Sequence, residues 1–453
     1  YGGGIAFGPG YPYTLGAYQT NFCNNTSGTT TDVTISKFDS SGTYLHFSTY
    51  LGGSYVDIPH SLHVNDNDEL YVFGTTASPD FPVTSNAFDT SFNGGPSVTL
   101  STSLGFPQGS DIFVSKFNMD GTQLLGSTFV GGTGNDGVNT ASGLRKNYAD
   151  DNRGEIVVDA NSNVFVVSST YSTDFPVVQS AYDTTQNGAQ DVCVFKMSYD
   201  LSQMIWSTLL GGSGNDAGYS MMLAADQSVY VCGGTTSTDL PVSQNAYQMM
   251  YAGNVDGFVA HISPNGDNLL QCTYLGFDSY DQAYLIKGDR DDVPHLFGQT
   301  AAAGNTWIHN AQYYTQGGGQ FLTKLSPQLD SVIWSTVFGS GAGGPDFSPT
   351  ALLVDYCNNI YMSGWGSQSL NGFGGTSGLP VTADAFQGVT DGSDYYFICI
   401  SDDVSQLVYA SFFGGSANSA REHVDGGTSR FDRKGRIYQA VCAGCGGQSS
   451  FPT

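Results

Sequence analysis

Histidine and serine are the side chains that most often carry catalysis, and neither stands in a catalytic pattern in this chain. Of the seven histidines, only His60 and His63 lie close together. Residues three apart on a strand face opposite sides of a sheet, which disfavours a shared metal ion. The sequence contains no Gly-x-Ser-x-Gly elbow and no His-Glu-x-x-His motif, the local signatures of serine hydrolases and zinc proteases. The sequence therefore predicts no catalytic residue.

Aspartates that follow glycine turns are the strongest candidates for a metal site. Asp136 stands in Gly-Asn-Asp after one such turn, and Asp216 stands in the same tripeptide after another. Calcium prefers carboxylate and carbonyl oxygens, but it needs six or more of them. Aspartate side chains also cap the backbone of their own turns. Calcium at Asp136 and Asp216 and plain turn caps are both open interpretations, and no other cofactor is indicated.

The cysteines show one suggestive spacing, Cys442-Ala-Gly-Cys445, among eight cysteines in all. Two cysteines in this arrangement can form half of a zinc site, but the sequence has no second pair of this spacing. A disulfide within the pair, or from either cysteine to Cys23, is the favoured alternative because disulfides persist outside the cell. The remaining cysteines are scattered through strand-like runs.

Composition and charge narrow the class of protein. The chain has 453 residues, of which 60 are glycine and only 12% are charged, and its net charge is −26. The electric field of a chain with this negative charge repels phosphate backbones and anionic membranes, so nucleic acid is a poor partner. The longest apolar runs are far shorter than the roughly 18 residues that a membrane-spanning helix needs. Low charge and abundant glycine favour many short strands joined by tight turns.

A repeat of about 63 to 80 residues organises the whole chain. Most units contain a polar corner of the type Asp174-Phe175-Pro176, and proline cannot occupy a paired central strand. Each unit also contains a nearly continuous apolar run, such as 70–74, which is typical of a strand buried on both faces. The other two strands are an alternating segment, such as 111–117, and a segment that ends in Gly-Gly, such as 126–132. With a further segment ahead of the apolar run, each unit has four strands.

Four short strands without helices form a small antiparallel sheet that must stack against its neighbours. The predicted fold is therefore all-β, a β-propeller of four-stranded antiparallel blades, since radial closure protects the terminal sheets. Seven blades are favoured over six, because the apolar strand at 4–8 duplicates the one at 437–441. We expect a single propeller over 1–453, a fragment of a larger multidomain protein. Its parts are a partial blade at 1–53, complete blades at 54–132, 133–212, 213–276, 277–339 and 340–415, and a partial blade at 416–453.

Five ordered elements of the repeat resemble a known family, the SBBP type of β-propeller repeat. They are Tyr50-Leu51-Gly52-Gly53, Val229-Tyr230-Val231, Asp174-Phe175-Pro176, Ala17-Tyr18-Gln19-Thr20 and Asp111 to Lys116. The unit from 277 to 339 departs from the pattern because it lacks the Asp-Phe-Pro corner. The ending at 438–447 is similar to the last repeat of large surface proteins of Bacteroidetes, many of them linked to gliding motility and type IX secretion. The resemblance implies an extracellular or cell-surface role, adhesive or architectural, and no chemistry.

Three insertions interrupt the repeat, at 95–109, 138–153 and 367–378. Loops on a rigid scaffold are where recognition usually resides, although insertions also arise by neutral drift. The leading hypothesis is a non-catalytic, adhesin-like or filament scaffold that binds a surface protein or a polysaccharide through these loops. The alternative is a glycan-active hydrolase or lyase, which needs two acids held in one pocket. Self-association of propellers is a third interpretation.

Overall fold

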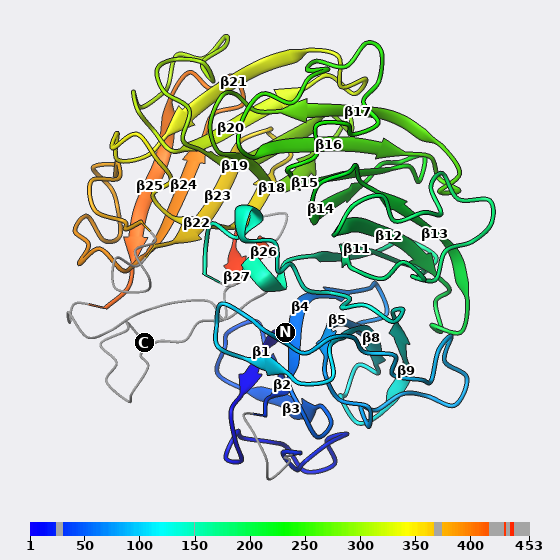
Figure 1. Ribbon diagram of the computed structural model, residues 1–453. Coiled ribbons are helices and arrows are strands. Elements are labelled where there is room, and N and C mark those ends of the chain that lie inside the picture. Colours follow the sequence, from blue (N-terminus) through cyan, green and yellow to red (C-terminus); the bar gives the residue numbers. More distant parts are fainter. Residues whose placement is uncertain (24–29, 149, 367–373, 416–429, 432–434, 439–453) are drawn as a thin grey trace.

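The repeat segments form six antiparallel sheets that succeed one another around a central axis (Figure 1). The computed structural model describes residues 1–23, 30–148, 150–366, 374–415, 430–431 and 435–438. Blade 1 consists of β1 (Gly2–Ala6), β2 (Asp32–Phe38) and β3 (Leu45–Leu51), and blade 2 consists of β4 (Asp57–Val64), β5 (Leu70–Thr76), β8 (Asp111–Phe117) and β9 (Leu124–Val130). Blade 3 consists of β10 (Glu155–Val158), β11 (Val164–Thr170), β12 (Asp191–Met197) and β13 (Met204–Leu210), and blade 4 consists of β14 (Asp216–Leu223), β15 (Val229–Thr235), β16 (Asp256–Ile262) and β17 (Leu269–Leu275). Blade 5 consists of β18 (Asp281–Gly288), β19 (Pro294–Thr300), β20 (Gln320–Leu325) and β21 (Val332–Phe338), and blade 6 consists of β22 (Ser348–Val354), β23 (Ile360–Trp365), β24 (Tyr395–Ile400) and β25 (Leu407–Phe413).

Six short elements in the described part of the chain lie outside these sheets. β6 (Val98–Thr99) pairs with β7 (Gly105–Phe106) inside the first insertion. The 3-10 helices η1 (Ser142–Leu144) and η2 (Asp150–Asn152) belong to the second insertion. β26 (Arg430–Phe431) pairs with β27 (Ile437–Tyr438) in a hairpin whose first strand lies near β22.

In blades 2 to 5 the second strand is the apolar run found in the sequence, and it is buried on both faces as predicted. Every residue of β5, β11, β15 and β19 is buried, because each blade packs one face on the preceding blade and the other on the next. The first strands of consecutive blades, from β4 to β22, lie beside one another and line the axis. Their side chains are therefore the ones that meet at the centre.

The structure confirms the all-β propeller of four-stranded antiparallel blades, and it corrects the favoured number of blades from seven to six. The apolar strand near the N-terminus starts no additional blade. As β1 it pairs with β2, with Ile5 opposite Val33, so it takes the place of the second strand in blade 1, although only Ala6 of this strand is buried. Blade 1 has three strands in the described part of the chain.

Blade 5, whose sequence departs from the repeat, keeps its packing through a different side chain. In blade 2 the corner residue Phe81 packs on Phe113, with ring centroids 4.5 Å apart. In blade 5 Trp307 stacks on Phe321 at 3.9 Å. The indole of Trp307 also donates a hydrogen bond of 3.2 Å to Asp281. Trp307 thus takes the packing place of the corner phenylalanine and adds a hydrogen bond to Asp281.

Candidate functional site

The insertion at 138–153, which we call the plug, lies over the centre of the propeller. Its two short helices, teal in Figure 1, sit among the first strands of the blades. The plug leads into the first strand of blade 3, and its polar contacts extend to blades 4, 5 and 6. The plug therefore covers part of the centre of the ring, where the first strands of the blades meet (Figure 1).

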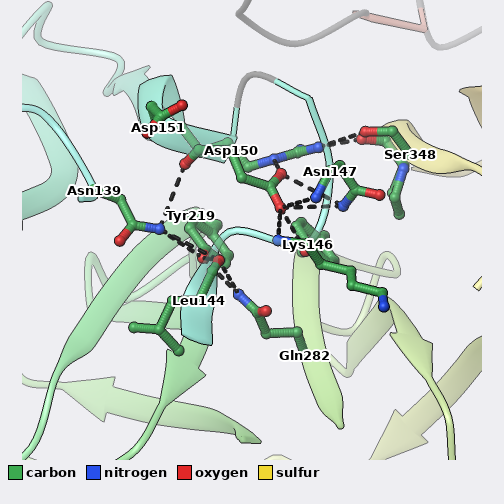
Figure 2. A network of polar contacts seen from close by, with 12 residues as sticks. Asn139, Leu144, Lys146, Asn147, Asp150, Asp151, Tyr219, Gln282 and Ser348 are labelled. Atoms are coloured by element: carbon green, nitrogen blue, oxygen red, sulfur yellow. Dashed lines mark hydrogen bonds and ion pairs between the residues drawn. The ribbon is translucent and has the colours of Figure 1, made fainter. Parts of the chain in front are cut away.

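Buried polar side chains hold the plug in place (Figure 2). The carbonyl of Leu144 accepts hydrogen bonds from the Tyr219 hydroxyl at 2.7 Å and from the Gln282 amide at 3.1 Å. Asn139 donates to the same Tyr219 hydroxyl at 3.2 Å, and Asn147 exchanges two hydrogen bonds of 2.9 Å with Gln299. Strands β14, β18 and β19 therefore each contribute to one network.

The strongest interaction in this network is the ion pair between Asp150 and Arg153. The Nε of Arg153 donates to Oδ1 of Asp150 at 2.6 Å, and the carboxylate is fully buried. The same guanidinium reaches blade 6, where it donates to the Ser348 hydroxyl at 2.8 Å and the Pro349 carbonyl at 3.1 Å. Tyr284 donates a further hydrogen bond of 2.9 Å to Asp150. A buried charge pair with this many partners holds its groups in one geometry.

A pocket of about 300 Å³ lies where the plug meets the insertion at 95–109. We call it the loop pocket. Its lining residues are Thr99, Leu100, Ser101, Ser142, Arg145 and Asn147. The two insertions are joined beneath it, because Asp151 of the plug accepts hydrogen bonds from both the backbone N–H and the hydroxyl of Ser101. Two insertions that are separate in the sequence therefore line one pocket.

A second charged cluster lies on the first strands of the blades. The Glu155 carboxylate accepts a hydrogen bond from Lys287 at 2.6 Å and one from Arg430 at 2.5 Å. Burial alone would raise the pKa of Glu155, but Lys287 and Arg430 lower it to about 2. Arg430 also donates to the Ser61 hydroxyl at 2.9 Å. The cluster ties the β26–β27 hairpin to blades 2, 3 and 5.

Asp136 and Asp216, the candidate calcium ligands, both cap the glycine turn four residues before them. Oδ2 of Asp136 accepts hydrogen bonds from the Gly132 N–H at 2.8 Å and the Ser172 hydroxyl at 2.7 Å, and its other oxygen accepts one from Thr170. Asp216 accepts the equivalent bonds from the Gly212 N–H and the Ser237 hydroxyl. The capping alternative thus has a geometric basis, and calcium binding stays a prediction. The described residues contain no group of three or more acidic, histidine or cysteine side chains placed to hold a metal ion.

Each of these caps lies beside an aspartate of the preceding blade, an arrangement that the sequence reading missed. A Cβ atom on Gly131 would lie 2.8 Å from Oδ1 of Asp111 and 2.8 Å from Oδ2 of Asp136. Burial raises the pKa of Asp111 to about 7 and that of Asp136 to about 8. The repeated Gly-Gly motif therefore leaves room for two buried carboxylates at a blade interface.

Of the three candidate disulfide cysteines, only Cys23 lies within the described residues. Cys442 and Cys445 lie outside the described residues, as does most of the insertion at 367–378. Cys23 is a free, half-buried thiol in the described part of the chain, and its backbone N–H donates a 2.9 Å hydrogen bond to Asp32. No helix in that part of the chain has the length and apolar character to span a bilayer.

The lysines at one position of the third strand pair mainly with carboxylates of their own blades. Lys37 does reach the next blade, at Asp68. Lys116 pairs with Glu69 at 2.9 Å and Lys196 with Asp159 at 3.5 Å, both within one blade. The carboxylates lie in the turn after the first strand, which folds back toward the third.

Sequence reasoning also missed the basic residues at the axis. Arg145, Lys146, Arg153, Lys287 and Arg430 are five of only 14 basic residues in the chain. Three of them fall within nine residues of the plug. In a chain so poor in Lys and Arg, that local concentration is the signal that could have located the site.

Comparisons with known proteins leave the activity open. Neither protein-family models nor curated proteins match the chain. Among solved structures, a protein of unknown function from Bacteroides caccae is similar over 84% of this chain and 89% of its own, with 9% identity and a TM-score of 0.35. An ulvan lyase structure matches over 87% and 80%, with 10% identity and a TM-score of 0.39. A NanB sialidase from Streptococcus pneumoniae matches over 84% and 64%, with 8% identity and a TM-score of 0.39. Similarity at this level carries no conclusion about what this chain binds.

Proposed function

We propose that this chain is a non-catalytic interaction scaffold, exported to the cell surface or the extracellular space, that binds a polysaccharide or another surface protein through its loops. The observation that carries the proposal is the convergence of two blade-specific insertions on one pocket. A propeller is a rigid support, and insertions on a rigid support are where binding usually develops. Scaffolds of this kind can also associate with copies of themselves, which the same loops would allow.

Charge and sequence resemblance support the extracellular setting. A net charge of −26 with few basic residues keeps a surface protein soluble in external salt. The SBBP-like repeat and the ending similar to Bacteroidetes surface proteins favour an adhesive or gliding-associated role. The alternative, a glycan-active enzyme, requires two carboxylic acids at the substrate, whereas the residues that line the loop pocket include none.

The insertion at 95–109 can be tested by replacement, because the neighbouring blade shows what the uninterrupted loop looks like. The N–H groups of Asn93 and Gly94 donate to Asp111 just as those of Asn187 and Gly188 donate to Asp191. Residues 95–109 therefore correspond to the single residue Ala189, and a one-alanine loop should join the two ends without strain.

We expect the one-alanine variant to fold but to lose at least 10-fold in binding to extracellular polysaccharide or to cell-surface protein, measured by pull-down and titration. A matched variant with a redesigned β18–β19 turn at 289–293 should bind normally. Unchanged binding by the one-alanine variant would show that the insertion at 95–109 takes no part in binding. Release of reducing ends or unsaturated sugars by the wild-type protein would favour the enzyme instead.

A further inference from the structure

The loop pocket contains a guanidinium group whose donors are only partly used. Nη1 of Arg145 donates to Oδ1 of Asp151 at 2.8 Å. In the described part of the chain, its Nη2 makes no hydrogen bond, and its Nε–H is buried without a partner. About a quarter of the side chain, 23%, is exposed. Arg145 is thus held by one ion pair while it keeps donors available at the pocket wall.

The ion pair that holds Arg145 is itself fixed by the other insertion. Asp151 is fully buried, and its Oδ2 accepts hydrogen bonds from the N–H and hydroxyl of Ser101. Because Asp151 has no exposed oxygen to offer a ligand, the charge that the pocket presents is the positive one of Arg145. An arginine positioned in advance by a buried partner loses little freedom on binding an anion.

The charge of the plug contrasts with the charge of the whole chain. The plug contains Arg145, Lys146 and Arg153 against Asp150 and Asp151, which leaves one positive charge in excess in a protein with a net charge of −26. The two aspartates pair with the two arginines. Lys146 is exposed and its Nζ lies 5.4 Å from the centroid of the Tyr280 ring. A ligand that binds beside the plug therefore meets a locally positive charge on a protein that is acidic overall.

The rest of the lining suits a sugar ring. Thr99, Ser101 and Ser142 are exposed and carry hydroxyl groups, while Leu100 is a buried apolar residue. Hydroxyl groups around a small apolar surface match the edges and the face of a pyranose. A volume of about 300 Å³ is at the small end of ligand pockets, which suits one ring.

We propose that the loop pocket binds a pyranose ring that carries a carboxylate, with Arg145 as its anion-binding group. The carboxylate pairs with the free face of the guanidinium, an interaction that is strong and directional. The ring hydroxyls bind the serine and threonine hydroxyls at the rim. This inference rests on the proposed function and names the ligand class for it.

Titration calorimetry with four probes tests the proposal: trigalacturonate, its methyl ester, 3′-sialyllactose and the methyl ester of 3′-sialyllactose. The first and third carry a carboxylate on a pyranose, and the other two are their uncharged counterparts. We expect at least one acid to bind, and its uncharged counterpart to bind about 10- to 100-fold more weakly, as the loss of a charged hydrogen bond predicts. The preferred acid distinguishes a uronic acid from a sialic acid.

Three variants complete the test. Arg145→Met removes the guanidinium, and Ser142→Trp fills the pocket while leaving the pair between Arg145 and Asp151 intact, so that it remains informative if Arg145→Met misfolds. Both should lose at least 10-fold in affinity for the acid. Arg290→Met makes the same change of charge at an exposed turn, where the side chain is 66% exposed, and should bind like the wild type.

The proposal is overturned if neither acid binds, if an acid and its uncharged counterpart bind equally, or if Ser142→Trp binds like the wild type. Failure here is distinguishable from failure of the scaffold function. If the one-alanine variant still loses its partner while the acids do not bind, the scaffold function stands and only the ligand class is wrong. If that variant binds its partner normally, the function itself is wrong.

Discussion

At the scale of single residues, the aspartates next to glycine turns combine two tasks. They cap the turn, and they lie against an aspartate of the neighbouring blade, as Asp136 lies near Asp111 around Gly131. Each carboxylate is satisfied by backbone N–H or hydroxyl donors. Space at Gly131 and donors around it are therefore the conditions under which two buried acids coexist.

Gly131→Ala should destabilise the protein, because the added Cβ would lie 2.8 Å from two carboxylate oxygens. We expect a loss of about 2 kcal/mol in the free energy of unfolding, typical of overpacking. Gly388→Ala is the matched control, since nothing lies within 4 Å of a Cβ at that position. Urea unfolding of both variants measures the difference, and equal stabilities would show that the interface yields easily.

Calcium is expected to leave the melting temperature unchanged. Both oxygens of Asp136 already accept hydrogen bonds from the protein, so calcium would have to replace them. Thermal unfolding with excess calcium and with EDTA measures the effect at pH 7.5. A ligand of the native state at 100 times its Kd stabilises by about 2.7 kcal/mol. A rise of several degrees would therefore support calcium at Asp136 and Asp216.

At the scale of elements, the plug joins blades that are far apart in sequence. Arg153 donates to Ser348, 195 residues away, and Asn147 bonds Gln299, 152 residues away. Propeller blades otherwise contact mainly their sequence neighbours. A plug that links blade 3 directly to blades 4, 5 and 6 adds a constraint across the ring.

Arg153→Met should therefore cost more than an ordinary surface substitution. It leaves the buried Asp150 carboxylate without its cation, which typically costs about 3 kcal/mol or more. The double variant with Asp150→Asn removes the uncompensated charge and should recover part of the loss. Chemical unfolding of the single and double variants gives the coupling energy between the two residues. If Arg153→Met were as stable as Arg290→Met, the plug would not be held by this pair.

At the scale of the whole molecule, buried acids of two kinds give stability an unusual dependence on pH. Burial raises the pKa of six blade-interface aspartates to between about 6 and 8: Asp32, Asp111, Asp136, Asp191, Asp216 and Asp256. Glu155 has the opposite shift, to about 2, because Lys287 and Arg430 outweigh its burial. The two groups therefore respond to pH in opposite directions.

The expected result is a maximum of stability near pH 4, close to the unfolded pKa values of the aspartates and of Glu155. The contribution of the aspartates is fully present below their unfolded pKa of 3.8 and is lost as pH rises through 6 to 8. The contribution of Glu155 is present above its unfolded pKa of 4.5 and is lost as pH falls toward 2. Calorimetric scans should show a melting temperature about 5 °C lower at pH 8.5 than at pH 5. A melting temperature that rises over this range would contradict the shifts of the aspartates.

The sequence by itself determined the strands, their order within each blade and the class of fold. Those features follow from local patterns: an apolar run such as 70–74 must be buried on both faces, and a proline corner such as 174–176 must leave the sheet. The insertions were also visible, because an interruption of a repeat needs no structure to be seen.

Only the tertiary structure decided the number of blades, the position of the plug and the site that the insertions build. The apolar strand at the N-terminus has the same pattern whether it starts a new blade or pairs with β2, so only its partner settles the count. Arg145 and Ser101 meet at Asp151 because two loops from different blades turn toward one axis. Contacts of that kind depend on how the ring closes, and no local pattern of residues encodes them.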